Sequence, residues 1–412
     1  MRQSKKILFI SYDGLTDPLG QSQIIPYLAG LTEYGYEFTI LSCDKKERYA
    51  KHKSYVLELL APYKIKWVSL PYHKSPGVLS SAYDYHQLKR TAIKLHKKEK
   101  FDLVHTRPGV PTLVALHLKR KYDIKFLNDV RGFWADERVD GGMWDMKNPL
   151  FKKIYSFFKN HEYACILESD YTTCLTTRAK IEMQSWKQLA GKKIPMEVIP
   201  CSVDLRLFDP LNINPSVKES VRKQLGIEKE DIIVSYLGSI GGWYLTDEMM
   251  QFCKSLSDAN PKIRFLFICP HRHEVIAAAA SKFGIPPSKF IVREGKRHEV
   301  PTLLSFSNYS LFFIKSSYSK MSSSPTKHGE IMAMGIPVIT NSGVGDVDSV
   351  IEKYNSGIVL SSLCNDEYKA VADSIFSFKF DPVAIRAAAK EFYGLDKAVE
   401  KYADVYSEVF AN

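Results

Sequence analysis

The stretch SSSPTKHGEIMAMGIPVIT, residues 322–340, decides the fold of this chain. Pro325 suits the first position of a helix and Ser324 the capping position before it, so we expect a short helix followed by a buried strand. On that helix Lys327 and Glu330 share a face with the free N–H groups of the first turn. Lys327 and the helix dipole would attract an anion, and Glu330 would accept hydrogen bonds from a sugar diol. The pattern indicates a nucleotide-sugar site, although a capped surface helix with an exposed Lys–Glu pair has the same pattern.

The length and composition of the chain indicate a globular protein of two domains. At 412 residues it exceeds what one hydrophobic core usually serves, and its 45% hydrophobic and 25% charged residues are ordinary proportions. The apolar run before Asp13 is too short for a signal peptide or a membrane span, so we expect a cytoplasmic location. The seven cysteines occur singly, which argues against a disulfide framework or a structural zinc site.

The positive charge of the chain is concentrated in its first half. Residues 1–200 carry 33 Lys and Arg against 21 Asp and Glu, which leaves 24 against 25 for the rest. Within that half, HQLKRTAIKLHKKEK (residues 86–100) predicts a helix with a basic face. Such a face suits an anionic membrane or a phosphate-bearing acceptor, and a solvated surface helix is the other interpretation. We expect no nucleic-acid partner, because the basic residues are not interleaved with aromatic ones.

Two series of alternating strands and helices divide the chain. The first opens with the apolar run at 7–11 and the second with the run at 232–236, and a strand at 338–340 is expected to complete the second sheet. Short apolar strands separated by helices predict parallel sheets covered on both faces. We therefore expect an α/β fold with two Rossmann-like domains facing each other across a cleft. The predicted segments are 1–200, 201–385, and 386–412, the last containing a helix that packs back on the first domain.

Glycines follow the first strand of each series. Gly238-Ser239-Ile240-Gly241-Gly242 permits close approach of a ligand before a helix start, so a diphosphate fits there, and a tight turn is the other interpretation. The spacing matches neither the dinucleotide fingerprint nor the P-loop, which argues against a dehydrogenase or an ATPase. In the first series, the loop SYDGLTDPLGQSQ (residues 11–23) brings Gly20 and Gln21 to the donor sugar or serves only as a turn.

Charged and aromatic side chains follow another strand end at NDVRGFWADER, residues 128–138. Asp129 could orient an acceptor hydroxyl and Arg131 could hold an anion, while ion pairing within the segment is the structural alternative. Arg293 follows a strand of the second series and is expected to border the nucleotide base. No two His or Cys have metal-ligand spacing, so we expect no metal.

Together these motifs resemble a GT-B glycosyltransferase of glycosyltransferase family 4. The resemblance covers essentially the whole chain. It rests on the first glycine loop, on VIPCSVDLRLFDP (198–210), on YLGSIGGWY (236–244) and above all on SPTKHGEIMAMGIPVI (324–339). The segment DVRGFWADERVDGG (129–142) is similar to family members linked to surface polysaccharide synthesis. This sequence departs from the family where Ser322 replaces the first Glu and Ser239 replaces an Arg after the phosphate-loop glycine.

The resemblance implies retaining, metal-independent transfer of a hexose from a UDP- or GDP-sugar, with no cofactor. The N-terminal domain would bind a glycan or polyprenyl-linked acceptor at the inner face of the membrane, in cell-surface polysaccharide or glycoconjugate synthesis. Lys327 and fixed dipoles would stabilise the charge that develops on the leaving diphosphate. The expected catalytic residues are Asp129, Arg131, Lys327 and Glu330. The expected donor-binding residues are Gly20, Gln21, Gly238, Ser239, Arg293, Ser322, Ser324, Lys327 and Glu330.

Two other functions remain open on the sequence. A nucleotide-sugar 2-epimerase of related fold would act on UDP-GlcNAc without an acceptor, although its carboxylate-rich site is not evident here. A nucleotide-sugar-binding subunit that has lost catalysis would account for the serines at Ser322 and Ser239. Turnover of a donor would favour an enzyme, and tight binding without turnover would favour the subunit.

Overall fold

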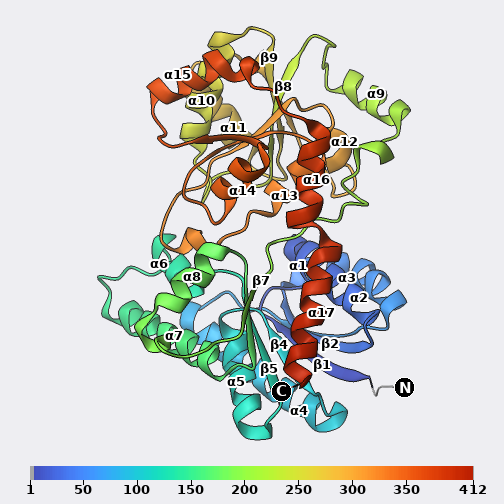
Figure 1. Ribbon diagram of the computed structural model, residues 1–412, viewed down its shortest axis with the longest axis vertical. Coiled ribbons are helices and arrows are strands. Elements are labelled where there is room, and N and C mark those ends of the chain that lie inside the picture. The colour runs from blue at the N-terminus through green and yellow to red at the C-terminus, as the bar shows by residue number, and fades with distance from the viewer. Residues whose placement is uncertain (1–3, 412) are drawn as a thin grey trace. The chain divides into compact units, whose positions relative to one another are not determined.

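The computed structural model describes residues 4–411 and divides the chain into two compact units. Unit 1 comprises Met1–Pro200 and Leu395–Asn412, and unit 2 comprises Cys201–Gly394. Each unit contains one parallel β-sheet with helices packed on it (Figure 1). The predicted α/β class with two Rossmann-like sheets is therefore confirmed.

The sheet of unit 1 has seven parallel strands in the order β3-β2-β1-β4-β5-β6-β7. Ile7 and Phe9 of β1 belong to one buried cluster and Leu8 and Ile10 to another, so both faces of the sheet are covered. The strands are β1 (Lys5–Ser11), β2 (Tyr36–Asp44), β3 (Lys66–Pro71), β4 (Leu103–Thr106), β5 (Lys125–Val130), β6 (Tyr171–Cys174) and β7 (Met196–Val198). The helices between them are α1 (Pro18–Gln23), α2 (Ile25–Thr32), α3 (Lys46–Leu60), α4 (Gly77–Glu99), α5 (Val110–Tyr122), α6 (Trp134–Asp140), α7 (Pro149–Glu168) and α8 (Thr177–Ser185).

The sheet of unit 2 has six parallel strands in the order β10-β9-β8-β11-β12-β13. Its strands are β8 (Ile232–Leu237), β9 (Ile263–Ile268), β10 (Phe290–Arg293), β11 (Tyr309–Phe312), β12 (Val338–Asn341) and β13 (Gly357–Leu360). The helices are α9 (Pro215–Gln224), α10 (Thr246–Ala259), α11 (His273–Lys282), α12 (Val300–Leu304), α13 (Thr326–Ala333), α14 (Val347–Tyr354), α15 (Asn365–Ser374) and α16 (Pro382–Tyr393). The loop after β8, the end of β10, the segment just before α13 and the first turns of α13 carry the predicted donor residues of this unit.

The last helix, α17 (Leu395–Ala411), packs on unit 1, where it contacts α2 and β5 (Figure 1). Its apolar stripe is buried, because the spacing of Val399, Tyr402 and Tyr406 places them on one face of the helix. A Cβ at Gly30 of α2 would lie 2.7 Å from a methyl group of Val399, so a glycine permits this close approach. The prediction that the final helix returns to the N-terminal part of the chain is confirmed.

Three local predictions are wrong. The strand β12 does not complete the second sheet, because β13 pairs with it in parallel and forms the edge. Residues 18–23 form helix α1 rather than a loop, since Pro18 occupies its first turn. Helix α13 begins at Thr326 with Pro325 in the capping position and no side-chain cap, and the Ser324 hydroxyl instead accepts a hydrogen bond from the Cys201 amide at 3.2 Å.

Candidate functional site

In unit 2, Lys327 lies beside the glycine loop that follows β8. The side chain extends from the first turn of α13, and its Nζ lies 3.0 Å from the position that a Cβ at Gly238 would take. The ammonium also lies 3.8 Å from the ring centre of Tyr244 and 4.4 Å from that of Tyr236. Gly238 has a φ of +114°, which a residue with a side chain rarely adopts, so glycine serves both the backbone and the contact with Lys327.

Lys327 is buried among aromatic rings, and its ammonium donates to the Tyr236 hydroxyl at 3.4 Å. Burial lowers the pKa of its ammonium group to about 7, and the Glu330 carboxylate only partly opposes this effect. The two aromatic rings attract a cation but do not neutralise it, because their interaction is through the ring quadrupole. A negatively charged ligand at Gly238 would therefore stabilise the charged form of Lys327.

Glu330 lies one turn further along α13 and is paired with Arg297. The Arg297 guanidinium donates to Glu330 Oε1 at 2.8 Å. Burial raises the pKa of Glu330, and Arg297 opposes that shift. The second carboxylate oxygen, Oε2, has no hydrogen-bond partner among residues 4–411. Arg297 thus orients a carboxylate that keeps one oxygen for a ligand.

The glycine loop itself is held by Tyr236 and flanked by Arg272. The Tyr236 hydroxyl donates to the carbonyl oxygen of Ser239. The Arg272 guanidinium lies against Gly241, where a Cβ would come within 3.0 Å of one of its nitrogens. Arg272 comes from the loop between β9 and α11 and is exposed. It supplies a second positive charge next to the loop in which Ser239 replaces a basic residue.

The other predicted donor residues of unit 2 lie in different environments. Ser322 is buried and its hydroxyl donates to the carbonyl oxygen of Ser319 at 2.6 Å. Ser324 lies just before α13, as described above. Arg293 ends strand β10 and is half-buried. The structure thus brings Lys327 to Gly238 and Arg297 to Glu330, and it gives the Ser322 hydroxyl an internal partner.

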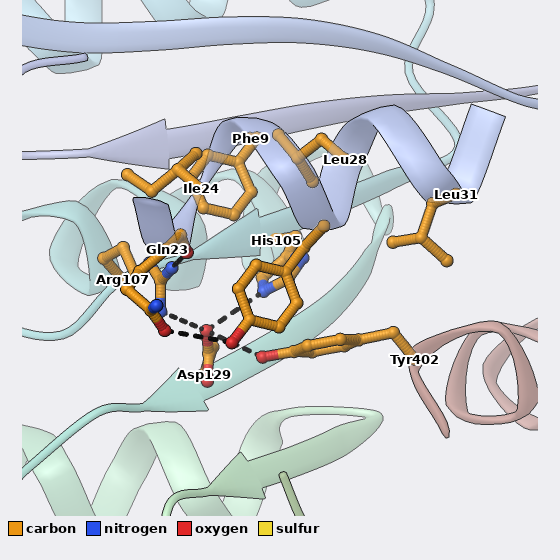
Figure 2. A pocket seen from close by; sticks show the side chains of 10 residues that line it. Phe9, Gln23, Ile24, Leu28, Leu31, His105, Arg107, Asp129 and Tyr402 are labelled. Atoms are coloured by element: carbon orange, nitrogen blue, oxygen red, sulfur yellow. Dashed lines mark hydrogen bonds and ion pairs between the residues drawn. The ribbon is translucent and has the colours of Figure 1, made fainter. Parts of the chain in front are cut away.

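In unit 1, Asp129 is the centre of a buried polar cluster (Figure 2). It is 2% exposed, and its carboxylate accepts from Arg107 at 2.9 Å, from Thr173 at 2.9 Å and from the Tyr402 hydroxyl at 3.2 Å. Burial alone would raise the pKa of Asp129, but the Arg107 and Arg131 guanidinium groups hold it well below its usual range. Both oxygens are engaged, so this carboxylate orients its neighbours and stays ionised.

The neighbours of Asp129 connect four elements of unit 1. His105 of β4 lies 3.6 Å from the Asp129 carboxylate, and its other ring nitrogen lies 2.8 Å from the Tyr406 hydroxyl of α17. Arg107 also donates to the backbone carbonyl of Gln23. Arg131 donates to the Gln23 side chain at 3.2 Å. The cluster therefore joins the ends of β4 and β5 to α17 and to the region of α1.

Gly20 and Gln21 lie on helix α1. Gly20 is buried, and a Cβ there would lie 2.5 Å from the carbonyl oxygen of Gly14, so only glycine fits. The Gln21 side chain donates to the carbonyl oxygen of Thr16 at 3.4 Å. Gly20 thus permits the close packing of α1 against the backbone of Gly14 and Leu15.

Sequence reasoning missed Arg107, Arg272 and Arg297. Arg107 directly follows β4, so its position after a strand end was an available signal. Arg272 and Arg297 lie in loops without a recognisable motif, and only the folded chain brings them to Gly241 and Glu330. Among residues 4–411, no group of three or more His, Cys, Asp or Glu is arranged to hold a metal ion.

Comparisons with known proteins find one matching family model and solved structures of similar fold. Residues 217–391 match the family described as Glycosyl transferases group 1. A glycosyltransferase from Rickettsia africae superposes with a TM-score of 0.73 at 16% identity, covering 99% of each chain. Anabaena HepE in complex with UDP and glucose gives 0.70 at 12%, over 98% of this chain and 99% of that one. WaaG, a glycosyltransferase involved in lipopolysaccharide biosynthesis, gives 0.64 at 13%, over 97% and 99%. A search of curated proteins finds no match to the sequence.

Proposed function

We propose that this chain is a GT-B glycosyltransferase that transfers a sugar from a nucleoside-diphosphate sugar to a glycan or polyprenyl-linked acceptor. The match of residues 217–391 to the family described as Glycosyl transferases group 1 supports the proposal. Transfer would retain the anomeric configuration, need no metal and serve the synthesis of a cell-surface polysaccharide or glycoconjugate. The observation that carries the proposal is the position of Lys327 Nζ beside Gly238, one helical turn from a carboxylate with a free oxygen.

The residues of unit 2 have separate tasks in this proposal. Glu330, oriented by Arg297, accepts hydrogen bonds from the ribose diol through Oε2. The diphosphate lies at the Gly238–Ser239 amides and the start of α13, where Lys327 and Arg272 face its charge. As the bond from the sugar to the diphosphate breaks, negative charge grows on the leaving oxygen, and the preformed positive group stabilises it. The acceptor hydroxyl then attacks the anomeric carbon on the face that the diphosphate leaves, and the hydroxyl proton passes to the departing diphosphate.

The residues of unit 1 position the acceptor side in this proposal. Asp129 acts through Arg107 and Arg131, because its own oxygens already accept three hydrogen bonds. Arg131 remains a half-buried cation that can contact an acceptor anion. The backbone near Gly20 and the Gln21 amide border the transferred sugar.

A donor panel tests the proposed function. UDP-, GDP- and ADP-sugars are incubated with the full chain, with and without EDTA, and release of nucleoside diphosphate is measured. We expect turnover of one donor class that EDTA leaves unchanged. Tight binding without turnover would replace the proposal by the catalytically lost subunit, and release of a 2-epimer of the sugar would replace it by the epimerase.

The pKa of Lys327 predicts proton uptake when the diphosphate binds. With a pKa of about 7, roughly one tenth of the free protein carries the ammonium at about pH 8. A neighbouring diphosphate raises the pKa, so binding takes a proton from the buffer. Calorimetric titration with UDP in two buffers of different ionisation enthalpy should reveal this uptake, and the affinity for UDP should fall as pH rises above about 7. Lys327→Met should abolish the uptake, and equal uptake in both proteins would contradict the assignment.

We also propose that α4 rests on an anionic membrane. Leu79, Arg90, Lys94 and Lys97 are exposed and recur at helical spacing, which places an apolar and three basic side chains on one stripe. Among residues 4–411, no helix has the length and apolar character needed to cross a bilayer, so contact would be peripheral.

Vesicle sedimentation tests the membrane contact. Binding to phosphatidylglycerol-containing vesicles should fall strongly between about 50 mM and about 500 mM salt, because salt screens these charges. The variant with Arg90, Lys94 and Lys97 all changed to Gln should lose binding. The matched variant with Lys223, Lys262 and Lys369 of unit 2 changed to Gln should keep it. Vesicle binding that is unchanged by salt and by the three α4 substitutions would refute the proposal.

A further inference from the structure

A second polar cluster lies in unit 1, outside the residues assigned above. It consists of His73, which follows β3, Asp84 of α4, and Tyr12, which follows β1. The ring nitrogen Nδ1 of His73 lies 2.6 Å from Asp84 Oδ1. Asp84 Oδ2 accepts from the backbone N–H of His73 at 3.0 Å and from the Tyr12 hydroxyl at 2.8 Å. The Asp84 side chain is 1% exposed, whereas that of His73 is 43% exposed.

These contacts decide which His73 nitrogen carries a hydrogen. Burial and the Asp84 carboxylate both raise the pKa of Tyr12, so its hydroxyl keeps its proton and donates. Asp84 is thus an acceptor on both oxygens, and His73 must donate from Nδ1. In the neutral ring the lone pair is then on Nε2, which has no hydrogen-bond partner among residues 4–411. The cluster therefore fixes the orientation of His73 Nε2, which is available as a hydrogen-bond acceptor.

Anchoring the loop after β3 does not explain the imidazole. The backbone N–H of His73 and the Tyr12 hydroxyl already tie that loop and the end of β1 to Asp84. With 43% of its side chain exposed, His73 is not needed as a fully buried anchor for the loop. What the ring does add is a fixed Nε2, and the supporting carboxylate is the usual means of orienting a functional histidine.

The surroundings of His73 suit a sugar. The ring of Tyr83 stands edge-on to that of His73, with centres 5.2 Å apart, and Tyr83 is 52% exposed. His73 and Tyr12 follow the carboxyl ends of β3 and β1, the edge at which parallel α/β sheets bind ligands. An aromatic face beside an oriented polar atom can contact the apolar face and a hydroxyl of one sugar ring.

We propose that His73 Nε2 accepts a hydrogen bond from a hydroxyl of the acceptor sugar, with Asp84 as its positioning residue and Tyr83 as the flanking aromatic surface. The inference rests on the proposed function, since it names a contact for the acceptor of that reaction. It assigns acceptor selection to the loop after β3 and the start of α4. No proton transfer is required of His73, because it selects and orients the hydroxyl.

Nitrogen-15 spectra of the full chain test this contact, with octyl β-D-glucoside below its micelle concentration as the probe. We expect the Nδ1-protonated ring for His73 and a saturable shift of its Nε2 signal with the glucoside. His73→Ala should raise the dissociation constant roughly fivefold to tenfold, the loss of one hydrogen bond. His86→Ala, at an exposed histidine of α4, should leave the dissociation constant unchanged.

The variant Asp84→Asn separates positioning from folding. We expect the His73 signals to show both ring tautomers and the glucoside to bind more weakly. The melting temperature should stay near that of Tyr12→Phe, a variant that removes one hydrogen-bond donor to the same carboxylate. A proton on Nε2 in the unaltered protein, no response of Nε2 to the glucoside, or unchanged affinity in His73→Ala would overturn the inference. Donor hydrolysis is measured separately on the unaltered chain, and its absence would mark failure of the proposed function rather than of this inference.

Discussion

Lys327→Met is expected to lower kcat roughly 100-fold, which corresponds to about 2.7 kcal/mol of transition-state stabilisation. Methionine keeps most of the apolar volume against Tyr236 and Tyr244, so the change removes the charge rather than the packing. The diphosphate carries more negative charge as it leaves than in the bound donor. The loss should therefore appear mainly in kcat and less in the affinity for UDP, as measured by steady-state kinetics and UDP titration.

Lys218→Met is the matched control for this change. Lys218 also lies over an aromatic ring, that of Phe306 at 5.4 Å, and burial also lowers its pKa, but it belongs to α9. We expect normal turnover from Lys218→Met. Similar losses of kcat in both variants would indicate a general loss of stability and would contradict the assignment of Lys327 to the phosphate site.

Glu330→Ala is expected to lower kcat/KM for the donor at least tenfold, about 1.4 kcal/mol or more. The ribose does not change during transfer, so its hydrogen bonds stabilise ground state and transition state alike. The effect should therefore appear as a higher KM and a weaker UDP affinity, with a smaller change in kcat. Arg297, whose side chain is 39% exposed, can turn to water after the substitution, so the fold should persist.

Glu391→Ala is the control for Glu330. Glu391 is also a carboxylate of unit 2 in an ion pair, with Lys353 at 3.1 Å, but it is 63% exposed and lies on α16. Its removal should leave kcat/KM unchanged. A Glu330 variant with unaltered KM and UDP affinity would show that the ribose lies elsewhere.

The two substitutions are expected to separate by kinetic signature as well as by size. A residue that meets developing charge changes kcat, and a residue that holds an unreacting part of the donor changes KM. The opposite assignment, with Lys327 affecting only KM and Glu330 only kcat, would reverse the roles proposed for the diphosphate and the ribose.

Local patterns were sufficient for most of the fold. Apolar runs at 7–11 and 232–236 predicted β1 and β8, because strands buried on both faces are apolar throughout. The stripe of Val399, Tyr402 and Tyr406 predicted a helix with one buried face. The short strand β13 was missed, since GIVL carries too little periodicity to be distinguished from other short apolar runs. Helix α1 was missed because glycine and proline favour turns in a sequence pattern.

The sequence by itself determined the two parallel sheets, the motif from residue 324 to 339, and the placing of Lys327 and Glu330 on one helix. These depend on the spacing of neighbours along the chain, which repeats every turn or every second residue. Only the tertiary structure decided that Arg297 orients Glu330, that Lys327 reaches Gly238, that Asp129 has no free oxygen, and that Asp84 holds His73. Those contacts join residues from separate loops and strands of one unit. They form when the chain packs within that unit, so no local sequence pattern predicts them.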